Sequence, residues 1–479
     1  MIKTYKQAEK YLEKFIPFIV NHKINESSKD ANYLLERMRY LLNLLDNPQK
    51  KFPSVIVSGT SGKGSTSYLI AQMLATAGYR TGLTISPHLQ KATERIQINQ
   101  QSSKLSPISD DDFLDLLNLV APVIKNMEKS MYGPPSYFEL LMALALETFA
   151  LRKVDIAVVE VGIEGKYDAT NIIDPLIFTL TNISLDHTAI LGETEEEIAD
   201  EATFRLNYID QNTKMVTTVI SGVKKPTVIK ILDERSKKLG MPLKLLGKDY
   251  SYEIENSQSF QGVRFYFNSL KDRLIENREV FSLALKGEFQ AENATNAIAT
   301  VRQLADYGFR VTNKDINQTL LTTKIPGRFE LTPLSVSGSP LDLIMDGAHN
   351  PAKMHAFLHS LGKNYPNHRK IFVVAFKKGK DAADMIRQLC SVADEIIFTQ
   401  FVSAMDWGRN MSMTLAEIKN QVAAVDHKEI KISYRLNVKK AFSFATQAAE
   451  KRQEANRPSI IIATGSLYLV GEVREYLNL

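Results

Sequence analysis

The residues best suited to chemistry lie in the stretch VIVSGTSGKGST, from Val55 to Thr66, where glycines bracket one lysine. A β-branched run precedes them, so the stretch predicts a strand that turns directly into a helix. Such a turn points backbone N–H groups and the positive end of the helix dipole at whatever it holds. Gly59, Gly62 and Gly64 leave room for oxygen atoms and permit the positive φ values of an anion-binding nest. The stretch therefore predicts a phosphate-binding loop.

This loop departs from the Walker A pattern G-x-x-x-x-G-K-[ST]. Val57 occupies the position of the first glycine, and Gly64 occupies that of the hydroxyl residue after the lysine. We interpret the loop as a variant in which the hydroxyl follows Lys-Gly. Lys63 would then reach the terminal phosphates, and Ser65 or Thr66 would offer a hydroxyl to a metal ion. The alternative is a glycine-rich turn with an exposed lysine.

Polar residues also follow three further apolar runs. They are Ser86 and His88 after TGLTI, Glu160 in VVEVG, and Asp186 and His187 in NISLDH. Ligands of open parallel sheets bind at the carboxyl ends of the strands, so these side chains are expected at one crevice with the phosphate loop. Oxygen ligands with one imidazole suit Mg²⁺ on a nucleotide. Taken singly, a strand-end glutamate such as Glu160 is more often a solvated or helix-capping residue, and an Asp-His pair after a strand makes a loop hydrogen bond about as often as it binds a metal; the joint arrangement favours a shared site.

The segment DGAHNP, from Asp346 to Pro351, has the same form: a strand, an acidic residue, small residues, a histidine and a helix start. Its alternative is a helix-capping turn. No Ser-His-Asp arrangement can be assembled, and the one cysteine, Cys390, lies far from these motifs. These parts predict an enzyme that binds ATP with Mg²⁺ and acts by positioning and charge neutralisation.

The elements that position these residues follow from the apolar pattern. Short β-rich runs at 54–59, 81–86, 154–161 and 177–184 alternate with segments of helical periodicity. This alternation predicts a parallel sheet covered by helices. Between about 241 and 287 strand follows strand, which predicts a small antiparallel extension.

A Pro-Gly pair in KIPGRFE (324–330) breaks the helical pattern, and a second α/β series follows it. We therefore predict an α/β protein of two doubly wound domains. The first, over 1–325, is a P-loop ATPase-like domain with the antiparallel extension, and the second, over 326–479, is a smaller Rossmann-like domain. The site is expected in the cleft between them.

Composition restricts the class of protein. The 479 residues are 44% hydrophobic and 24% charged, as in ordinary globular proteins, and the net charge of +5 is mild. The charges are interspersed, which argues against a nucleic-acid partner. A single cysteine fits a reducing compartment. The charged N-terminal segment and the absence of a run of about 18 apolar residues predict a cytoplasmic protein with no membrane partner.

The order of many motifs resembles the folylpolyglutamate synthase/dihydrofolate synthase family, a branch of the Mur ligase superfamily. The motifs are LLERMRYLLNLLDNP, VSGTSGKGST, GYRTGLTISPHL, ERIQIN, SYFELL, VDIAVVEVGIEGKYDATN, LTNISLDHTAILGETEEEIA, GEFQAENATNAI, IPGRFE, DGAHNP and ATGSLYLVGEVRE. The resemblance implies an ATP-dependent amide ligase. Such a ligase phosphorylates a pteroyl or folyl carboxylate to an acyl phosphate, which the amino group of L-glutamate attacks, and ADP and phosphate are released.

Carried over by motif, the resemblance implies particular site residues. The ATP loop falls on Gly59, Thr60, Ser61, Gly62, Lys63, Gly64 and Ser65. The Mg²⁺ ligands fall on Ser86, Glu160 and His187, in agreement with the strand-end argument. Further nucleotide contacts fall on Asn293 for adenine, Arg328 for phosphate, Asp346 for ribose, and His349 beside the nucleotide.

The same resemblance makes Lys63 and His187 the catalytic candidates. Phe138, Glu139 and Asp168 are candidate substrate contacts. The implied cofactors are ATP and Mg²⁺, the substrates are folate or pteroate and L-glutamate, and family members are usually monomeric.

Three positions depart from the family pattern. Ala202 stands where the family has a carboxylated lysine that helps to hold a second magnesium ion. Asp200 or Glu201 would substitute for it, or the second ion is held differently or lost. Glu164 and Lys166 replace a glycine and an arginine; lysine lacks the bidentate fork of arginine. Two alternatives stay open: an acid-amine ligase with a different acceptor, and an ATP-binding homologue that has lost catalysis.

Overall fold

The structure is a computed structural model of the chain. It describes residues 1–16, 28–99, 102–185, 188–209, 216–255, 262–269, 277–336, 339–402, 411–425, 430–450 and 457–479. The chain divides into two compact units. Unit 1 consists of Met1–Phe260, Arg264–Leu283 and Gln290–Thr323, and unit 2 of Gln261–Val263, Ala284–Phe289 and Lys324–Leu479.

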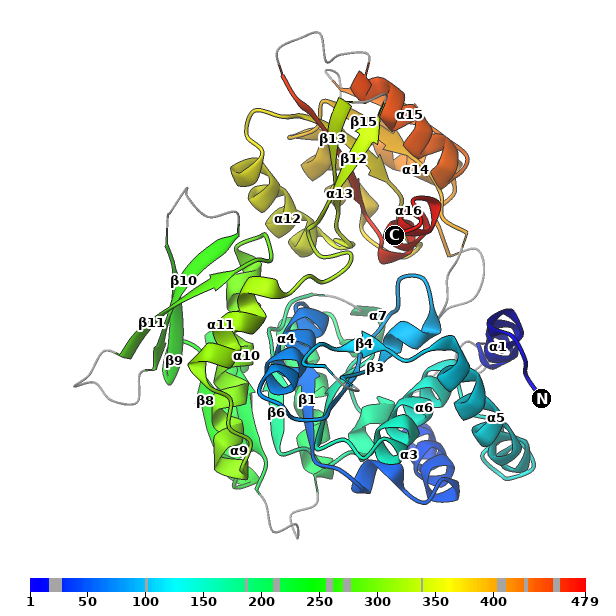
Figure 1. Ribbon diagram of the computed structural model, residues 1–479, viewed down its shortest axis with the longest axis vertical. Helices are drawn as coiled ribbons and strands as arrows, with labels where there is room; N and C mark the ends of the chain where they lie inside the picture. The colour runs from blue at the N-terminus through cyan, green and yellow to red at the C-terminus, as the bar shows by residue number, and fades with distance from the viewer. Residues whose placement is uncertain are drawn as a thin grey trace. The chain divides into compact units, whose positions relative to one another are not determined.

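A large sheet forms the centre of unit 1, with the strand order β4-β3-β2-β5-β1-β6-β7-β8 (Figure 1). The strands are β1 (Ser54–Ser58), β2 (Thr81–Thr84), β3 (Ile96–Ile98), β4 (Ser106–Pro107), β5 (Ile156–Glu160), β6 (Ile177–Leu180), β7 (Thr218–Ser221) and β8 (Leu243–Leu245). The pairs from β2 to β8 are parallel, and β3 and β4 extend the sheet antiparallel. All residues of β1, β2, β5, β6 and β7 are buried. Strands covered on both faces need apolar residues on both, which explains the apolar runs in β1, β5 and β6.

Several of the helices of unit 1 cover this sheet, and the others pack on those helices or on the second sheet. They are α1 (Tyr5–Leu12), α3 (Ser28–Leu44), α4 (Lys63–Thr76), α5 (Asp110–Met127), α6 (Tyr137–Leu151), α7 (Thr188–Leu191), α8 (Glu195–Phe204), α9 (Pro226–Lys238), α10 (Phe289–Gln303) and α11 (Asn313–Thr322). Short 3-10 helices are η1 (Glu13–Phe15), η2 (Pro48–Lys50), η3 (Ala92–Arg95), η4 (Ala169–Ile172), η5 (Arg205–Tyr208) and η6 (Leu304–Tyr307). Helix α4 packs on β1, β2 and β5 and against α11, whereas α3, α5 and α6 pack together.

A second, three-stranded sheet, β11-β10-β9, belongs mainly to unit 1 and is seen beside α11 in Figure 1. Its strands are β9 (Tyr250–Ile254), β10 (Val263–Ser269) and β11 (Asn277–Leu283). Strands β9 and β10 pair antiparallel. This sheet is the predicted antiparallel extension.

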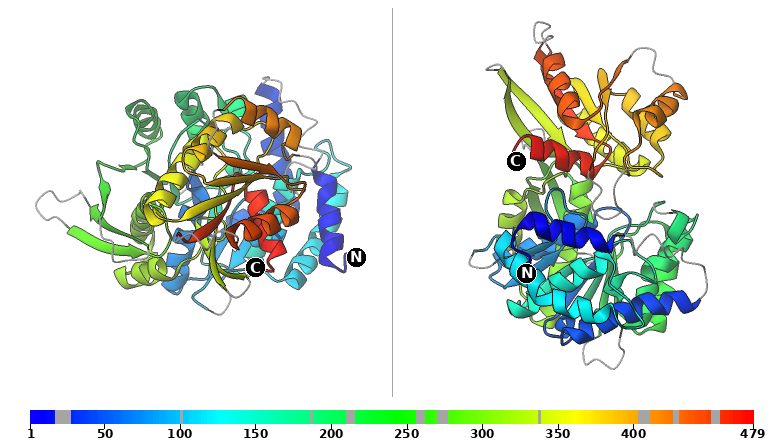
Figure 2. Two further views of the ribbon diagram at one scale, coloured as in Figure 1. Left: turned by 90° about the horizontal axis from the view of Figure 1, so that it is seen from above. Right: turned by 90° about the vertical axis from the view of Figure 1, so that its right-hand side faces the viewer.

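Unit 2 contains a sheet with the order β12-β13-β17-β14-β15-β16. Its strands are β12 (Glu330–Val336), β13 (Ser339–Met345), β14 (Arg369–Val374), β15 (Glu395–Phe398), β16 (Lys431–Tyr434) and β17 (Ser459–Thr464). Its helices are α12 (Pro351–Asn364), α13 (Ala382–Cys390), α14 (Leu415–Ala423), α15 (Val438–Glu450) and α16 (Leu467–Tyr476). Figure 2 shows helices on both sides of this sheet. All of its pairs are parallel except β12 with β13.

The predicted fold class, two α/β domains built on parallel sheets, is confirmed. The sequence did not predict the antiparallel edge strands β3, β4 and β12 as separate elements. Within the described ranges, no helix combines the length and the apolar character needed to cross a bilayer.

Candidate nucleotide-binding site

The glycine-rich loop connects the central strand β1 to α4, as its sequence predicts. Gly62, just before α4, has φ +85°, and Gly59 has φ +126°. A Cβ atom at Gly59 would lie 2.1 Å from Thr181 Oγ1, and one at Gly62 would lie 2.2 Å from Asn293 Oδ1. Backbone conformation and space therefore both require glycine at these two positions.

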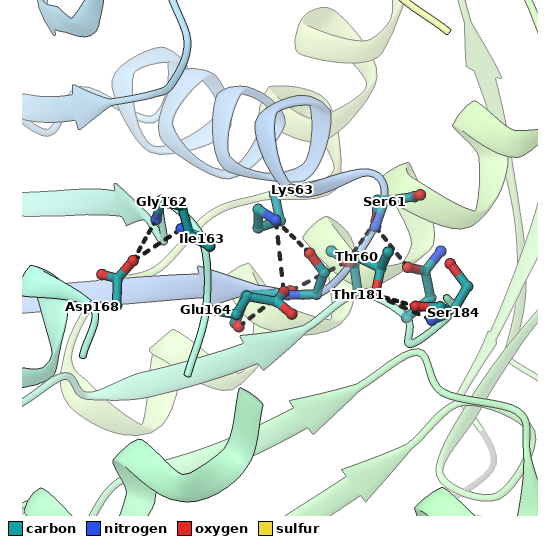
Figure 3. A network of polar contacts seen from close by, with 12 residues as sticks. Thr60, Ser61, Lys63, Gly162, Ile163, Glu164, Asp168, Thr181 and Ser184 are labelled. Atoms are coloured by element: carbon teal, nitrogen blue, oxygen red, sulfur yellow. Dashed lines mark hydrogen bonds and ion pairs between the residues drawn. The ribbon is translucent and has the colours of Figure 1, made fainter. Parts of the chain in front are cut away.

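Residues that follow β6 hold the loop in shape (Figure 3). Asn182 accepts the N–H of Thr60 at its backbone oxygen (2.9 Å) and the N–H of Ser61 at its side-chain oxygen (2.8 Å). The hydroxyl of Thr181 donates to the carbonyl of Ser61 at 2.7 Å, and Ser184 N donates to Thr60 Oγ1 at 3.1 Å. Thr181, Asn182 and Ser184 were not predicted as site residues, although they follow the same strand as Asp186 and so lie at the same end of the sheet.

Lys63 is folded back onto the loop. Its ammonium group donates to the carbonyl oxygen of Gly59 at 2.6 Å and lies 3.6 Å from Glu164 Oε1. The same Glu164 oxygen accepts the N–H of Gly59 at 2.5 Å, and Ser58 Oγ donates to it at 3.4 Å (Figure 3). The residue Glu164 is buried, with 6% of its surface exposed. A carboxylate therefore lies against the loop's lysine and first amide.

Two of the predicted metal ligands lie beside this loop. Glu160, the last residue of β5, accepts the N–H of Ser86 at 2.7 Å. A Cβ atom at Gly64 would lie 3.4 Å from Glu160 Oε1, which places the carboxylate next to the start of α4. The third predicted ligand, His187, lies outside the described residues, as does Asp186.

The residues beside the loop include oxygen atoms that could bind a metal ion. In the part of the chain that is described, no three or more His, Cys, Asp or Glu side chains are grouped to hold a metal ion. The oxygen donors near the loop, Glu160 with the hydroxyls of Ser86 and Ser65, are of the hard type that Mg²⁺ prefers. The residues present fit a Mg²⁺ ion bound jointly by protein and nucleotide, which needs few protein ligands.

His88 is buried and serves the fold in this structure. Arg95 Nε donates to its Nδ1 at 2.8 Å. Burial, reinforced by the positive charge of Arg95, holds the pKa of His88 well below its usual range. The imidazole is therefore neutral and accepts at Nδ1.

The candidate substrate contacts have partners within unit 1. Asp168 Oδ2 accepts the N–H groups of Gly162 and Ile163 at 3.0 Å each. Glu139 completes a capping box at the start of α6 and pairs with Arg37 at 2.9 Å. The ring of Phe138 packs closely against Gly162. A Cβ atom at Gly162 would lie 2.6 Å from Phe138 Cζ. Their assignment to substrate stays a prediction.

The adenine candidate, Asn293, lies in α10 beside the loop. Its Nδ2 donates to Gln290 Oε1 at 2.9 Å, and its Oδ1 faces Gly62. Asn293 therefore lies next to the phosphate loop within unit 1, and its contact with adenine stays a prediction.

In unit 2, Asp346 follows β13 and is buried. Its carboxylate accepts the N–H groups of Phe329 and Ala348 at 2.8 and 2.9 Å. Burial raises the pKa of Asp346 to about 6, although Arg328 and these two N–H groups oppose the shift. His349 Nδ1 lies 2.7 Å from the carbonyl oxygen of Gly347.

DGAHNP also caps a helix, as its alternative interpretation predicted. Asn350 Oδ1 accepts the N–H of Lys353 at 2.8 Å at the start of α12. The capping residue is Asn350 and not Asp346 or His349.

This chain is similar to known proteins over most of its length. A Mur ligase middle domain model matches residues 125–301, and a model of the dihydrofolate synthetase C-terminal domain matches residues 329–479. The chain belongs to the folylpolyglutamate synthase/dihydrofolate synthase family.

Individual members of this family match over nearly the full chain. The dihydrofolate synthase/folylpolyglutamate synthase of Bacillus subtilis is 29% identical over 451 residues, which cover 93% of this chain and 95% of that protein. The dihydrofolate synthetase of Saccharomyces cerevisiae is 29% identical over 454 residues, covering 93% and 97%. A folylpolyglutamate synthase structure from Mycobacterium tuberculosis, complexed with ADP and AMPPCP, has a TM-score of 0.79 at 26% identity and covers 93% and 95% of the two chains.

The residues around Ala202, where the resemblance predicts a departure from the family pattern, form ion pairs within the chain. Ala202 is buried in α8. The neighbouring Glu201 pairs with Lys166 Nζ at 2.9 Å and also accepts the N–H of Lys166 at 3.1 Å. Asp200 pairs with Arg235. Both carboxylates that were candidates to replace the family's carboxylated lysine are thus paired with cations of the chain itself.

Proposed function

We propose that this protein joins L-glutamate to the carboxylate of a pteroyl or folyl substrate at the expense of ATP. The observation that carries the proposal is the end-to-end similarity to dihydrofolate and folylpolyglutamate synthases, on a chain whose phosphate loop has the expected form. Dihydrofolate synthesis, polyglutamate extension and both together are all within this proposal.

The reaction proceeds in two displacements. A carboxylate oxygen of the substrate attacks the terminal phosphorus of ATP, the bond to the bridging oxygen breaks, and ADP leaves. The amino group of glutamate then attacks the acyl carbon, and phosphate leaves. Little covalent chemistry is required of the protein, so catalysis depends on positioning and on charge neutralisation.

The residues of unit 1 supply these effects. The amides at the start of α4 and the ammonium of Lys63 offset the negative charge of the phosphates. Glu160, Ser86 and Ser65 would hold Mg²⁺, which when bound neutralises charge on the terminal phosphates. His187 is a further proposed ligand of this ion.

Other nucleotide contacts are proposed from the resemblance alone. Asn293 would contact adenine, Arg328 a phosphate and Asp346 the ribose, with His349 close to the nucleotide. Two observations suit these roles: Asn293 faces Gly62 of the loop, and Asp346 is a buried carboxylate beside Arg328.

A substrate-dependent phosphate-release assay tests the proposal. Purified protein with ATP, Mg²⁺ and L-glutamate is expected to release phosphate only when dihydropteroate or a reduced folate is added. Mass spectrometry of the product should show one added glutamate residue, or more. Phosphate release that does not depend on a pterin acid would contradict the proposed function.

An acid-amine ligase with a different acceptor is the second candidate. The Lys166–Glu201 ion pair favours it, because Lys166 stands where the resemblance places an arginine, and Glu201 directly precedes Ala202, which stands where it places a carboxylated lysine. Profiling carboxylic acid and amino acid pairs for ADP formation separates the two candidates, since only the first requires a pterin.

A further inference from the structure

Glu164 occupies a backbone conformation that normally belongs to glycine. Its φ is +76°, in the left-handed region, and it lies between Gly162 and Gly165 in the sequence GIEG. For a residue with a Cβ this conformation costs on the order of 1 kcal/mol. The side chain is nevertheless held inside the protein, with 2% of it exposed.

The groups that Glu164 contacts are those that a phosphate loop offers to an anion. Its Oε1 accepts the N–H of Gly59, the first amide of the loop, and lies 3.6 Å from Lys63 Nζ. The hydroxyl of Ser58 donates to the same oxygen. A carboxylate and a phosphate are both oxygen anions and accept the same donors, so only one of them can use these donors at a time.

The charges around Glu164 stabilise its carboxylate in this position. Burial raises its pKa, while Lys63 and the N–H of Gly59 oppose that shift and Asp168 adds to it. The ammonium of Lys63 in turn has one carboxylate partner and the carbonyl oxygen of Gly59. A buried or half-buried charge is costly unless it is paired, so the pair stabilises both groups in the absence of phosphate.

We propose that Glu164 is an internal anion that occupies the phosphate loop of the nucleotide-free protein and is displaced when a nucleotide binds. The proposal rests on the nucleotide site of the proposed function and adds a residue that sets its affinity. The nucleotide must compete with Glu164 for the loop. The apparent Kd for the nucleotide therefore equals the intrinsic Kd divided by the fraction of molecules in which Glu164 has left the loop.

Isothermal titration of the full chain with ADP and Mg²⁺ tests this competition. Glu164→Gln keeps the shape of the side chain and removes its charge, and it is expected to tighten ADP binding by about tenfold. Glu164→Gly removes the side chain and the unfavourable φ, and it should bind ADP at least as tightly as Glu164→Gln. A purely structural role of Glu164 predicts the opposite, since loss of a structural contact weakens binding or leaves it unchanged.

A matched control separates relief of backbone strain from loss of the anion. Lys153 is exposed and also has a positive φ, +48°, so Lys153→Gly relieves strain without touching the loop. It is expected to leave the Kd for ADP unchanged. Equal or weaker ADP binding by both Glu164 variants overturns the proposal, as does a tenfold gain in Lys153→Gly.

Lys63→Ala distinguishes this failure from failure of the proposed function. If the wild type binds ADP, Lys63→Ala does not, and the Glu164 variants match the wild type, the nucleotide site stands and only the internal anion is wrong. If Lys63→Ala binds ADP as the wild type does, the loop is not the nucleotide site, and both proposals fall.

Discussion

At the scale of single residues, Lys63 matters in two ways, because its ammonium faces both the phosphate site and a buried carboxylate. From the sequence alone, the lysine acts on phosphate charge and not on packing. In the structure it is also the cation that pairs with Glu164. Its replacement is therefore expected to affect catalysis and stability through different contacts.

Lys63→Ala should lower turnover by roughly 10²- to 10³-fold or more, since a positioned charge is lost where negative charge develops. It should also lower the free energy of unfolding by about 1–3 kcal/mol, because Glu164 is left buried without its cation. The double variant Lys63→Ala/Glu164→Gln should regain stability but not turnover. Phosphate release and urea unfolding measure the two effects. Wild-type turnover in Lys63→Ala, or a double variant no more stable than the single one, would contradict this account.

His88 predicts a pH dependence whose sign follows from its lowered pKa. Below about pH 6.5 the unfolded chain binds a proton at this histidine and the folded protein does not, so stability falls as the pH falls. His88→Asn keeps an acceptor for Arg95 and removes the titration. The difference in unfolding free energy between wild type and variant should change by about 1.4 kcal/mol per pH unit below pH 6.5. A difference that is constant from pH 5 to 8 would show that His88 is not neutral and buried.

The placement of single residues could be predicted where position in the sheet decides it, whereas the roles of these residues as ligands stay predictions. Glu160 and Ser86 lie beside the loop because the strands that precede them are parallel neighbours, a consequence of the strand pattern. The contact of Glu164 with Gly59 was not predictable. It depends on the rotamer of one side chain in a turn with positive φ, and sequence periodicity carries no information on that.

At the scale of elements, the close contact between α6 and the turn after β5 positions the segment that carries Glu164 and Asp168. Gly162 begins this turn, and the ring of Phe138 fills the space where a Cβ would lie. The shape of the turn thus depends on a glycine and an aromatic ring from different elements.

Gly162→Ala is expected to destabilise the protein by about 1–3 kcal/mol, because the added methyl group overlaps the Phe138 ring. Phe138→Leu in the same chain should restore part of this loss by removing the overlapping atoms. A double-mutant cycle of unfolding free energies measures the coupling. The control is Gly78→Ala, at a glycine with open space around its Cβ position, which should show no coupling to Phe138→Leu. Additive effects of Gly162→Ala and Phe138→Leu would show that the two residues do not share this space.

Elements differed in how well the sequence revealed them. The central strands β1, β5 and β6 are buried on both faces and appear as uninterrupted apolar runs. Strand β12 lies at a sheet edge, pairs antiparallel with β13 and contains Pro333. A proline at an edge removes no ladder bond that the sheet needs, but it makes the segment look like a loop in the sequence.

At the scale of the whole molecule, the proposed nucleotide contacts fall in both units. Lys63 and Asn293 belong to unit 1, whereas Arg328, Asp346 and His349 belong to unit 2. A ligand that contacts both units stabilises both, and one that contacts unit 1 alone leaves the stability of unit 2 unchanged. Thermodynamic linkage therefore tests the unit 2 assignments.

Cys390 reports on unit 2. It is the single cysteine of the chain, lies at the end of α13 and is half-buried, and burial raises the pKa of its thiol. Both properties slow its reaction with thiol reagents until unit 2 opens. The labelling rate in a low concentration of urea then measures the opening of unit 2, and amide exchange in α4 measures that of unit 1.

ADP with Mg²⁺ at about a hundred times its Kd is expected to stabilise the contacted units by about 2.7 kcal/mol, which would slow Cys390 labelling up to a hundredfold. Asp346→Ala should abolish this slowing while amide protection in α4 persists at saturating ADP. The matched control, Asp342→Ala, changes a carboxylate within β13, four residues before Asp346, and should retain the slowing. If ADP protects α4 but leaves Cys390 labelling unchanged in the wild type, the nucleotide contacts only unit 1. Arg328, Asp346 and His349 would then have no part in binding it.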